Sequence, residues 1–276
     1  MHLKKTTKIL IAVCVIGLCL LLYPTVSNYW NEKHSTKAIN SYVESIEKIS
    51  DEQYVKLWTD AVAYNEKLKQ RDNQFQLPDK LKTEYESCLN LNGDGIIGYI
   101  EISKLGVSLP LYHGTSDTVL QRAIGHIDWT SLPTGGEGTH CAVSGHRGLP
   151  SAKLFTELDK LREGDLFVLT VLNETLTYEV DQIRVVEPDD AADLLPEQGK
   201  DYCTLVTCTP YGINTHRLLV RGHRVESVNA GGIHIVSEAV VIDPLIVAPV
   251  VAFPILLALL LIVLFKKPES KKKTGD

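Results

Sequence analysis

The stretch TLVTCTPYGINTHRLLVRG, residues 204–222, contains two short apolar runs joined by a polar loop. Cys208 ends the first run, and Arg217 opens the second. If the two runs pair as antiparallel strands, the guanidinium returns beside the thiol. A nearby cation favours the thiolate, which is the nucleophilic form of cysteine. The stretch therefore predicts a hairpin with a candidate catalytic cysteine; a buried, inert thiol is the alternative.

The surrounding sequence, from Gly98 to about Val225, consists of short β-like runs separated by turns. The runs are GYIEI, VSLPLY, HCAVSG, LFVLTVL, LTYEVDQIRVV, CTLVTC and RLLVRGHRV. Short strands at regular spacing are typical of a β-sandwich or a β-barrel. The residues before them differ in character. Residues 36–70 have the apolar spacing of two helices, with a capping box at Ser50 and Gln53, and residues 71–92 are a polar linker or flap.

Two apolar blocks flank this outer region. Residues 9–26 follow Lys4, Lys5 and Lys8, a pattern typical of an uncleaved signal anchor. Residues 245–265 are 21 uncharged apolar residues, enough to cross a bilayer, and five lysines follow them. Because basic flanks stay on the cytoplasmic side, we expect two spans, both termini in the cytoplasm and residues 27–244 on the extracellular face.

The charge of the outer segment limits its partners. It carries 20 Lys and Arg against 32 Asp and Glu, which gives a formal net charge of −12. This balance argues against binding to nucleic acid. The sequence has no C-x-x-C, H-x-x-x-H or H-E-x-x-H pattern, so we expect no metal and no cofactor. Residues 90–101 match most positions of a calcium loop, but the strand-like GYIEI that follows favours a simple turn.

Several motifs resemble those of sortases, the cysteine transpeptidases of Gram-positive surfaces. TLVTC with RLLVRG resembles the signature around the family's cysteine and arginine, and SGHRG, residues 144–148, resembles its histidine motif. The stretches GYIEI, LPLYHGT and residues 138–165 resemble, in this order, the class C branch, which polymerises pilins. The resemblance covers roughly residues 93–225.

The resemblance implies a fold and a reaction. The fold it implies is a closed eight-stranded β-barrel. With the helices and apolar blocks described above, we expect a mainly β protein that has an N-terminal helical segment and one transmembrane helix at each end. Cys208 would be the nucleophile, His146 the acid and base, and Arg217 the cation near the substrate carbonyl. The enzyme would cleave an LPXTG-like sorting signal between Thr and Gly through a thioacyl intermediate. It would then join pilin subunits through a lysine isopeptide bond. Thr207 would position the substrate or the strand.

Two features depart from the class C pattern. The D-P-aromatic motif that usually plugs the class C site is absent from residues 66–92, and Phe75 is the nearest aromatic candidate for such a lid. The second feature is a pair of cysteines, Cys141 and Cys203, which lie five residues before His146 and Cys208. If their strands run side by side in parallel, the two thiols are neighbours and a disulfide is possible.

The sequence divides into six segments. They are a basic tip with the signal anchor (1–26), a helical stalk and possible lid (27–92), the catalytic barrel (93–225), a connector (226–244), the second span (245–265) and a basic tail (266–276). Two other functions stay open. One is a sortase that attaches surface proteins to a cell-wall peptidoglycan amine. The other is a non-enzymatic, membrane-anchored adhesin or scaffold.

Overall fold

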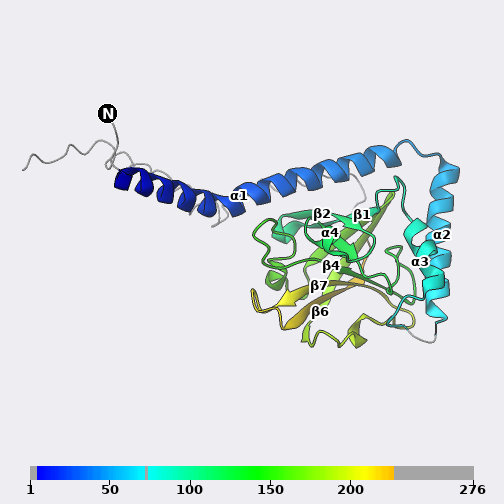
Figure 1. Cartoon of the computed structure of the whole chain (residues 1–276). Coiled ribbons are helices and arrows are strands. Elements are labelled where there is room, and N and C mark those ends of the chain that lie inside the picture. The colour runs from blue at the N-terminus through cyan, green and yellow to red at the C-terminus, as the bar shows by residue number, and fades with distance from the viewer. Residues whose placement is uncertain (1–4, 72–73, 227–276) are drawn as a thin grey trace, which may run out of the picture. The chain divides into compact units, whose positions relative to one another are not determined.

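The computed structural model describes residues 5–71 and 74–226 (Figure 1). Eight strands close into one barrel in the order β1-β2-β3-β4-β7-β8-β6-β5. The strands are β1 Ile96–Ile102, β2 Val107–Tyr112, β3 Ile124–His126, β4 Thr139–Ser144, β5 Leu166–Val171, β6 Glu174–Val186, β7 Asp201–Thr209 and β8 His216–Arg224. The expected mainly β fold with a closed eight-stranded barrel is therefore confirmed.

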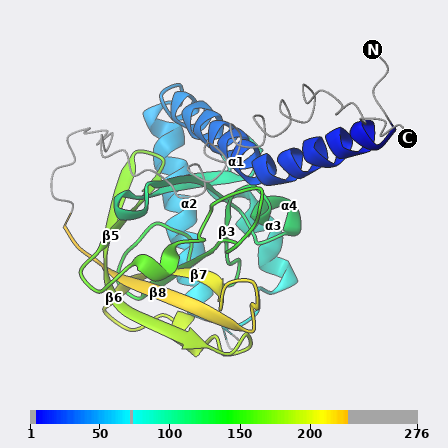
Figure 2. The same cartoon turned by 90° about the vertical axis from the view of Figure 1, so that its left-hand side faces the viewer.

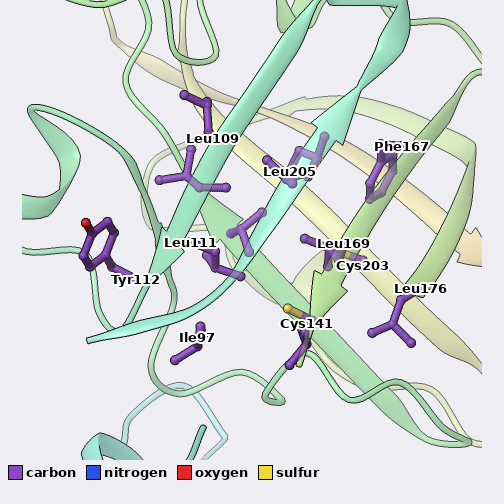
Figure 3. Packing of buried hydrophobic residues seen from close by; sticks show 14 of the residues in the cluster. Ile97, Leu109, Leu111, Tyr112, Cys141, Phe167, Leu169, Leu176, Cys203 and Leu205 are labelled. Carbon is purple, nitrogen blue, oxygen red and sulfur yellow. The ribbon is translucent and has the colours of Figure 1, made fainter. Parts of the chain in front are cut away.

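The barrel has two apolar clusters, one on each side of its wall. Side chains alternate between the two faces of a strand, so neighbouring residues belong to different clusters. Cys141 and Cys203 belong to the large interior cluster, which also contains Leu111, Phe167 and Leu205 (Figure 3). The smaller cluster lies on the outer face of β4, β7, β8 and the end of β6, and we call it the outer apolar strip; its members are Ala142, Val186, Leu194, Val206 and Leu219.

In the part of the chain that the structure describes, four α-helices accompany the barrel: α1 Lys5–Ile46, α2 Asp51–Lys69, α3 Asp79–Ser87 and α4 Asp117–Leu120. Short 3₁₀ helices occupy Ser103–Leu105, Leu158–Lys160 and Ala192–Leu194. The capping box predicted for Ser50 and Gln53 is present at the start of α2. The helix expected from residue 36 begins far earlier, because α1 continues without a break from the apolar block into the stalk.

Helix α2 lies beside α3 and packs on the barrel (Figure 1). Its buried Asn65 donates to the carbonyl of Leu132 at 3.0 Å and accepts from the Leu132 amide at 2.8 Å. The loop between β3 and β4 is therefore fixed to α2. This contact matters for the site, because the same loop carries Trp129 over the outer apolar strip.

One helix among the described residues is long and apolar enough to cross a membrane, and it is part of α1. The second expected span, residues 245–265, and the connector lie outside the described residues. The candidate calcium loop is a turn that leads into β1: the amide of Gly95 donates to Asn90 Oδ1 and that of Ile96 to Asp94 Oδ1.

Candidate active site

The predicted juxtaposition of Cys208 and Arg217 is present in the structure. Strands β7 and β8 pair antiparallel, and Cys208 is the register partner of Arg217. Figure 2 shows β7, β8 and β6 as neighbouring strands. Cys208 lies two residues after Val206 on β7, so its side chain shares the face of the outer apolar strip. The thiol is half-buried, in contrast to the fully buried Cys203.

His146 follows β4, which runs parallel to β7. The register pairs Ser144 with Val206, and the amide of Gly145 donates to the Val206 carbonyl at 3.0 Å. If the same offset of 62 residues continues for two more positions, His146 lies opposite Cys208. The histidine, the cysteine and the arginine therefore come from the same end of three adjacent strands.

Thr207 occupies the inner side of this arrangement. Its side chain is 1% exposed, and its hydroxyl donates to the carbonyl of Gly145 at 2.7 Å. A hydroxyl used in this way is committed to the neighbouring backbone. Of the two roles expected for Thr207, the geometry favours positioning of the strands over contact with substrate.

The loop after His146 folds back on the histidine. The amide of Phe155 donates to the His146 carbonyl at 3.2 Å, and that of Gly148 donates to Thr156 Oγ1 at 3.1 Å. The ring of Phe155 packs so closely on Gly145 that an added Cβ would lie 2.7 Å from the ring. A side chain at this position, directly before the histidine, would force the Phe155 ring to move.

Arg217 keeps most of its donors available. Nη1 donates to the carbonyl of His216 at 3.1 Å and to that of Asn214 at 3.4 Å. Within residues 5–71 and 74–226, no carboxylate lies within ion-pair distance of its guanidinium. A half-buried cation without a bound carboxylate can receive an anion that develops during a reaction.

The segment before α3 lies at the edge of the outer apolar strip. The Phe75 ring is 5.9 Å from that of Trp129, and Arg71 donates to the carbonyl oxygens of Trp129 and Gln76. Phe75 remains 50% exposed. The structure thus brings Phe75 to Trp129 at the edge of the strip.

Residues that the sequence did not single out complete the site. Arg147 donates to Asp159 Oδ2 at 2.6 Å and to Thr209 Oγ1 at 3.1 Å. Its place beside the histidine in SGHRG was a signal, but its partners are 12 and 62 residues away.

His140 is a buried histidine at the opposite end of β4, paired with Tyr202 and therefore outside this site. Its Nδ1 donates to the carbonyl of Leu195 at 2.9 Å, and its Nε2 forms a hydrogen bond of 2.7 Å with Thr204 Oγ1. His140 thereby links the loop between β6 and β7 to β4 and β7. Desolvation lowers its pKa to about 4, so it is neutral at pH 7. Spacing could not separate the histidines of the outer segment from one another, whereas burial does: His113, His126 and His140 are held inside the domain.

The two buried cysteines are neighbours on parallel strands, as the sequence predicted. Cys141 and Cys203 are register partners on the parallel strands β4 and β7, and both thiols are free. Figure 3 shows both side chains in the interior cluster. Burial raises the pKa of Cys203 well above its usual value, so this thiol is not a nucleophile at neutral pH.

Comparison with known proteins agrees with this geometry. Residues 100–225 match the family model of the sortase domain. The sortase C1 of Streptococcus agalactiae is 51% identical, with a TM-score of 0.67, over 69% of this chain and 98% of that one.

Two further structures are similar. A Streptococcus pneumoniae sortase C, whose structure is described as informative on catalysis and pilin substrate specificity, is 43% identical over 69% of this chain and 97% of that one, with a TM-score of 0.63. A Clostridium perfringens sortase C with the C-terminal cell wall sorting motif is 43% identical over 70% of this chain and 100% of that one, with a TM-score of 0.61.

The family match and the similar structures define the class of this protein as a cysteine transpeptidase. The chain belongs to the sortase family, and its similarity to sortase C structures supports the class C branch.

Proposed function

We propose that this chain is a membrane-anchored, pilin-polymerising sortase in which Cys208, His146 and Arg217 carry out the reaction. The observation that carries this proposal is the register around β7, which pairs Cys208 with Arg217 and, if extended, sets His146 opposite Cys208. A thiol, an imidazole and a guanidinium at one rim are the groups that acyl transfer through a thioester needs.

The first half of the reaction breaks the Thr–Gly bond of an LPXTG-like signal. The Cys208 thiolate attacks the threonine carbonyl carbon, and the oxyanion that forms is stabilised by the Arg217 guanidinium. Collapse of this intermediate expels the glycine amine, which takes a proton from the His146 imidazolium. The product is a thioester between Cys208 and threonine.

The second half transfers the acyl group. A lysine amine of the next pilin subunit attacks the thioester, and neutral His146 accepts the proton that the amine loses. The thiolate of Cys208 leaves, and an isopeptide bond joins the two subunits.

Similarity to sortases C supports a pilin lysine as the acceptor, because one of these structures is described in terms of pilin substrate specificity. A sortase that uses a cell-wall amine is the second candidate. The absence of a D-P-aromatic triplet from residues 66–92 favours it. Membership of an enzyme family disfavours the non-enzymatic scaffold.

We also propose the segment boundaries and the topology. The apolar part of helix α1 supports a membrane anchor. Lysines precede residues 9–26 and follow residues 245–265, which supports cytoplasmic termini and a barrel on the extracellular face. Residues 27–92 then form the stalk and flap, 93–225 the catalytic barrel and 226–244 the connector. Within the flap, Phe75 is proposed as a partial lid, since it packs on Trp129 at the edge of the strip.

The test uses the full-length protein in detergent with an LPXTG peptide and either a pilin domain or a glycine-bearing amine. Intact-mass spectrometry detects the thioacyl enzyme, and product analysis identifies the amine used. We expect Cys208→Ala to abolish the intermediate and Cys88→Ala, a buried cysteine at the end of α3, to preserve it. Unchanged turnover in Cys208→Ala would exclude the proposed nucleophile, and exclusive use of the glycine amine would favour the cell-wall alternative.

A further inference from the structure

Arg147 is a partly buried cation beside the proposed histidine. Its side chain is 9% exposed, yet it extends to two separate elements. Nη2 donates to Asp159 Oδ2, in the 3₁₀ helix Leu158–Lys160, at 2.6 Å. Nη1 donates to Thr209 Oγ1, in the last residue of β7, at 3.1 Å. One guanidinium thus joins the loop after His146 to the residue after Cys208.

This link lies where the backbone ladder ends. The last register pair of β4 and β7 is Ser144 with Val206, and one further bond joins Gly145 to Val206. Beyond that bond no ladder hydrogen bond between the two strands is present in the described chain. Two side-chain bonds continue the connection. Thr207 Oγ1 donates to the carbonyl of Gly145, and Arg147 then joins the residue after His146 to the residue after Cys208 through Thr209 Oγ1.

We propose that Arg147 is a positioning residue that holds His146 in line with Cys208, an inference that rests on the proposed function. Arginine suits this task because its planar fork presents several donors in fixed directions. A lysine in the same place has a single nitrogen on a flexible stem and cannot reproduce the two directions. A displacement of about 1 Å between reacting groups can lower a rate by roughly a hundredfold.

The charge of Arg147 is balanced locally. Asp159 pairs with it, while Glu157 of the same loop pairs with Lys153 and Lys160. Arg217 lies across β7, as the partner of Cys208. Without Asp159, an unpaired cation next to His146 would disfavour the imidazolium that donates the proton. The ion pair therefore supplies a rigid link without adding net charge to the site.

The test compares two rates in the full-length enzyme. Formation of the thioacyl enzyme requires both Cys208 and an aligned His146, whereas alkylation of Cys208 by a small thiol reagent requires the thiolate alone. We expect Thr209→Val, Arg147→Lys and Asp159→Asn each to lower kcat for acylation at least tenfold, with KM and the alkylation rate changed less than about threefold. Thr209→Val is the central variant because it keeps the shape of the side chain and every charge.

The matched control is Asp181→Asn. Asp181 pairs with Arg221 of β8 through two bonds of 3.0 and 3.1 Å, and both side chains are partly buried. Loss of this pair should lower the Tm and leave both rates unchanged. The proposal is wrong if Thr209→Val acylates at the normal rate, or if acylation and alkylation fall by the same factor. Retained activity in Cys208→Ala or His146→Ala would instead overturn the proposed function itself.

Discussion

Among the single residues of the site, Arg217 owes its position to the hairpin between β7 and β8, whose register fixes it opposite Cys208. We expect Arg217→Ala to lower the rate of thioacyl formation by roughly 10²–10³, the usual effect of removing an oxyanion donor. The fold should persist, because the side chain forms only two long bonds to nearby carbonyls. Single-turnover mass spectrometry measures the rate, and circular dichroism checks the fold. A variant as fast as the parent would exclude the role.

Thr207 gives a prediction on stability. In Thr207→Val the hydroxyl is replaced by a methyl group, and the buried carbonyl of Gly145 loses its donor. Such a loss costs about 1–3 kcal/mol of unfolding free energy. Thr207→Ser retains the hydroxyl and is the matched control. Denaturant unfolding with a constant m-value measures the change; equal stability in the two variants would contradict it.

The residues of the site differ in how far the sequence could predict them. Cys208 and Arg217 could be paired because both flank one short loop, and the family motif pointed to His146. Arg147 and Thr209 were missed, since they are 62 residues apart in the chain and only the β4–β7 contact brings them together. Local spacing carries no information on such contacts.

Among the structural elements, the loop between β4 and β5 is packed tightly around Gly145. A Cβ added to this glycine would lie 2.7 Å from Phe155 and 3.0 Å from Ile124. We expect Gly145→Ala to destabilise the protein by about 1–3 kcal/mol through overpacking. The thioacylation rate should fall as well, because His146 follows directly.

A second substitution separates packing from other causes. Phe155→Leu removes the ring that the new methyl would meet, so the double variant should recover part of the lost stability. Thermal unfolding of the two single variants and the double variant gives the coupling between the two sites. Simple additivity would show that the Phe155 contact is not the reason for the effect.

At this scale the sequence predicted most strands and the capping box of α2, because period and capping signals are local. It did not predict β3, which has three residues, nor the parallel pairing of β2 with β3. The sequence also indicated a helix only from residue 36, whereas α1 begins at Lys5. The apolar block and the stalk form one continuous helix, so no capping signal marks the point where one passes into the other.

For the molecule as a whole, the β-barrel and the class of protein could be predicted from the ordered motifs over residues 93–225. Closure of the barrel, however, depends on the pairing of β1 with β5 and of β4 with β7. These pairs join strands that are distant in sequence. Closure also places the imidazoles of His113 and His140 away from solvent, so the stability of the protein depends on pH.

Desolvation lowers the pKa of both His113 and His140 to about 4. In the unfolded chain a histidine titrates near pH 6.5, so between about pH 6.5 and 4 the unfolded state binds more protons than the folded state. The stability that comes from keeping these imidazoles neutral is therefore complete above pH 6.5 and is lost as the pH falls. Each histidine should contribute a slope of about 1.4 kcal/mol per pH unit in this window.

Denaturant unfolding from pH 7 to 4.5 tests this, with His113→Gln, His140→Gln and the double variant beside the parent. Glutamine does not titrate, so each substitution should flatten the slope by about one proton, and the double variant by about two. At pH 7 the same variants lose hydrogen bonds or packing and should be less stable than the parent, so the curves converge as the pH falls. Parallel curves for the parent and the double variant would show that neither histidine is held neutral by the fold.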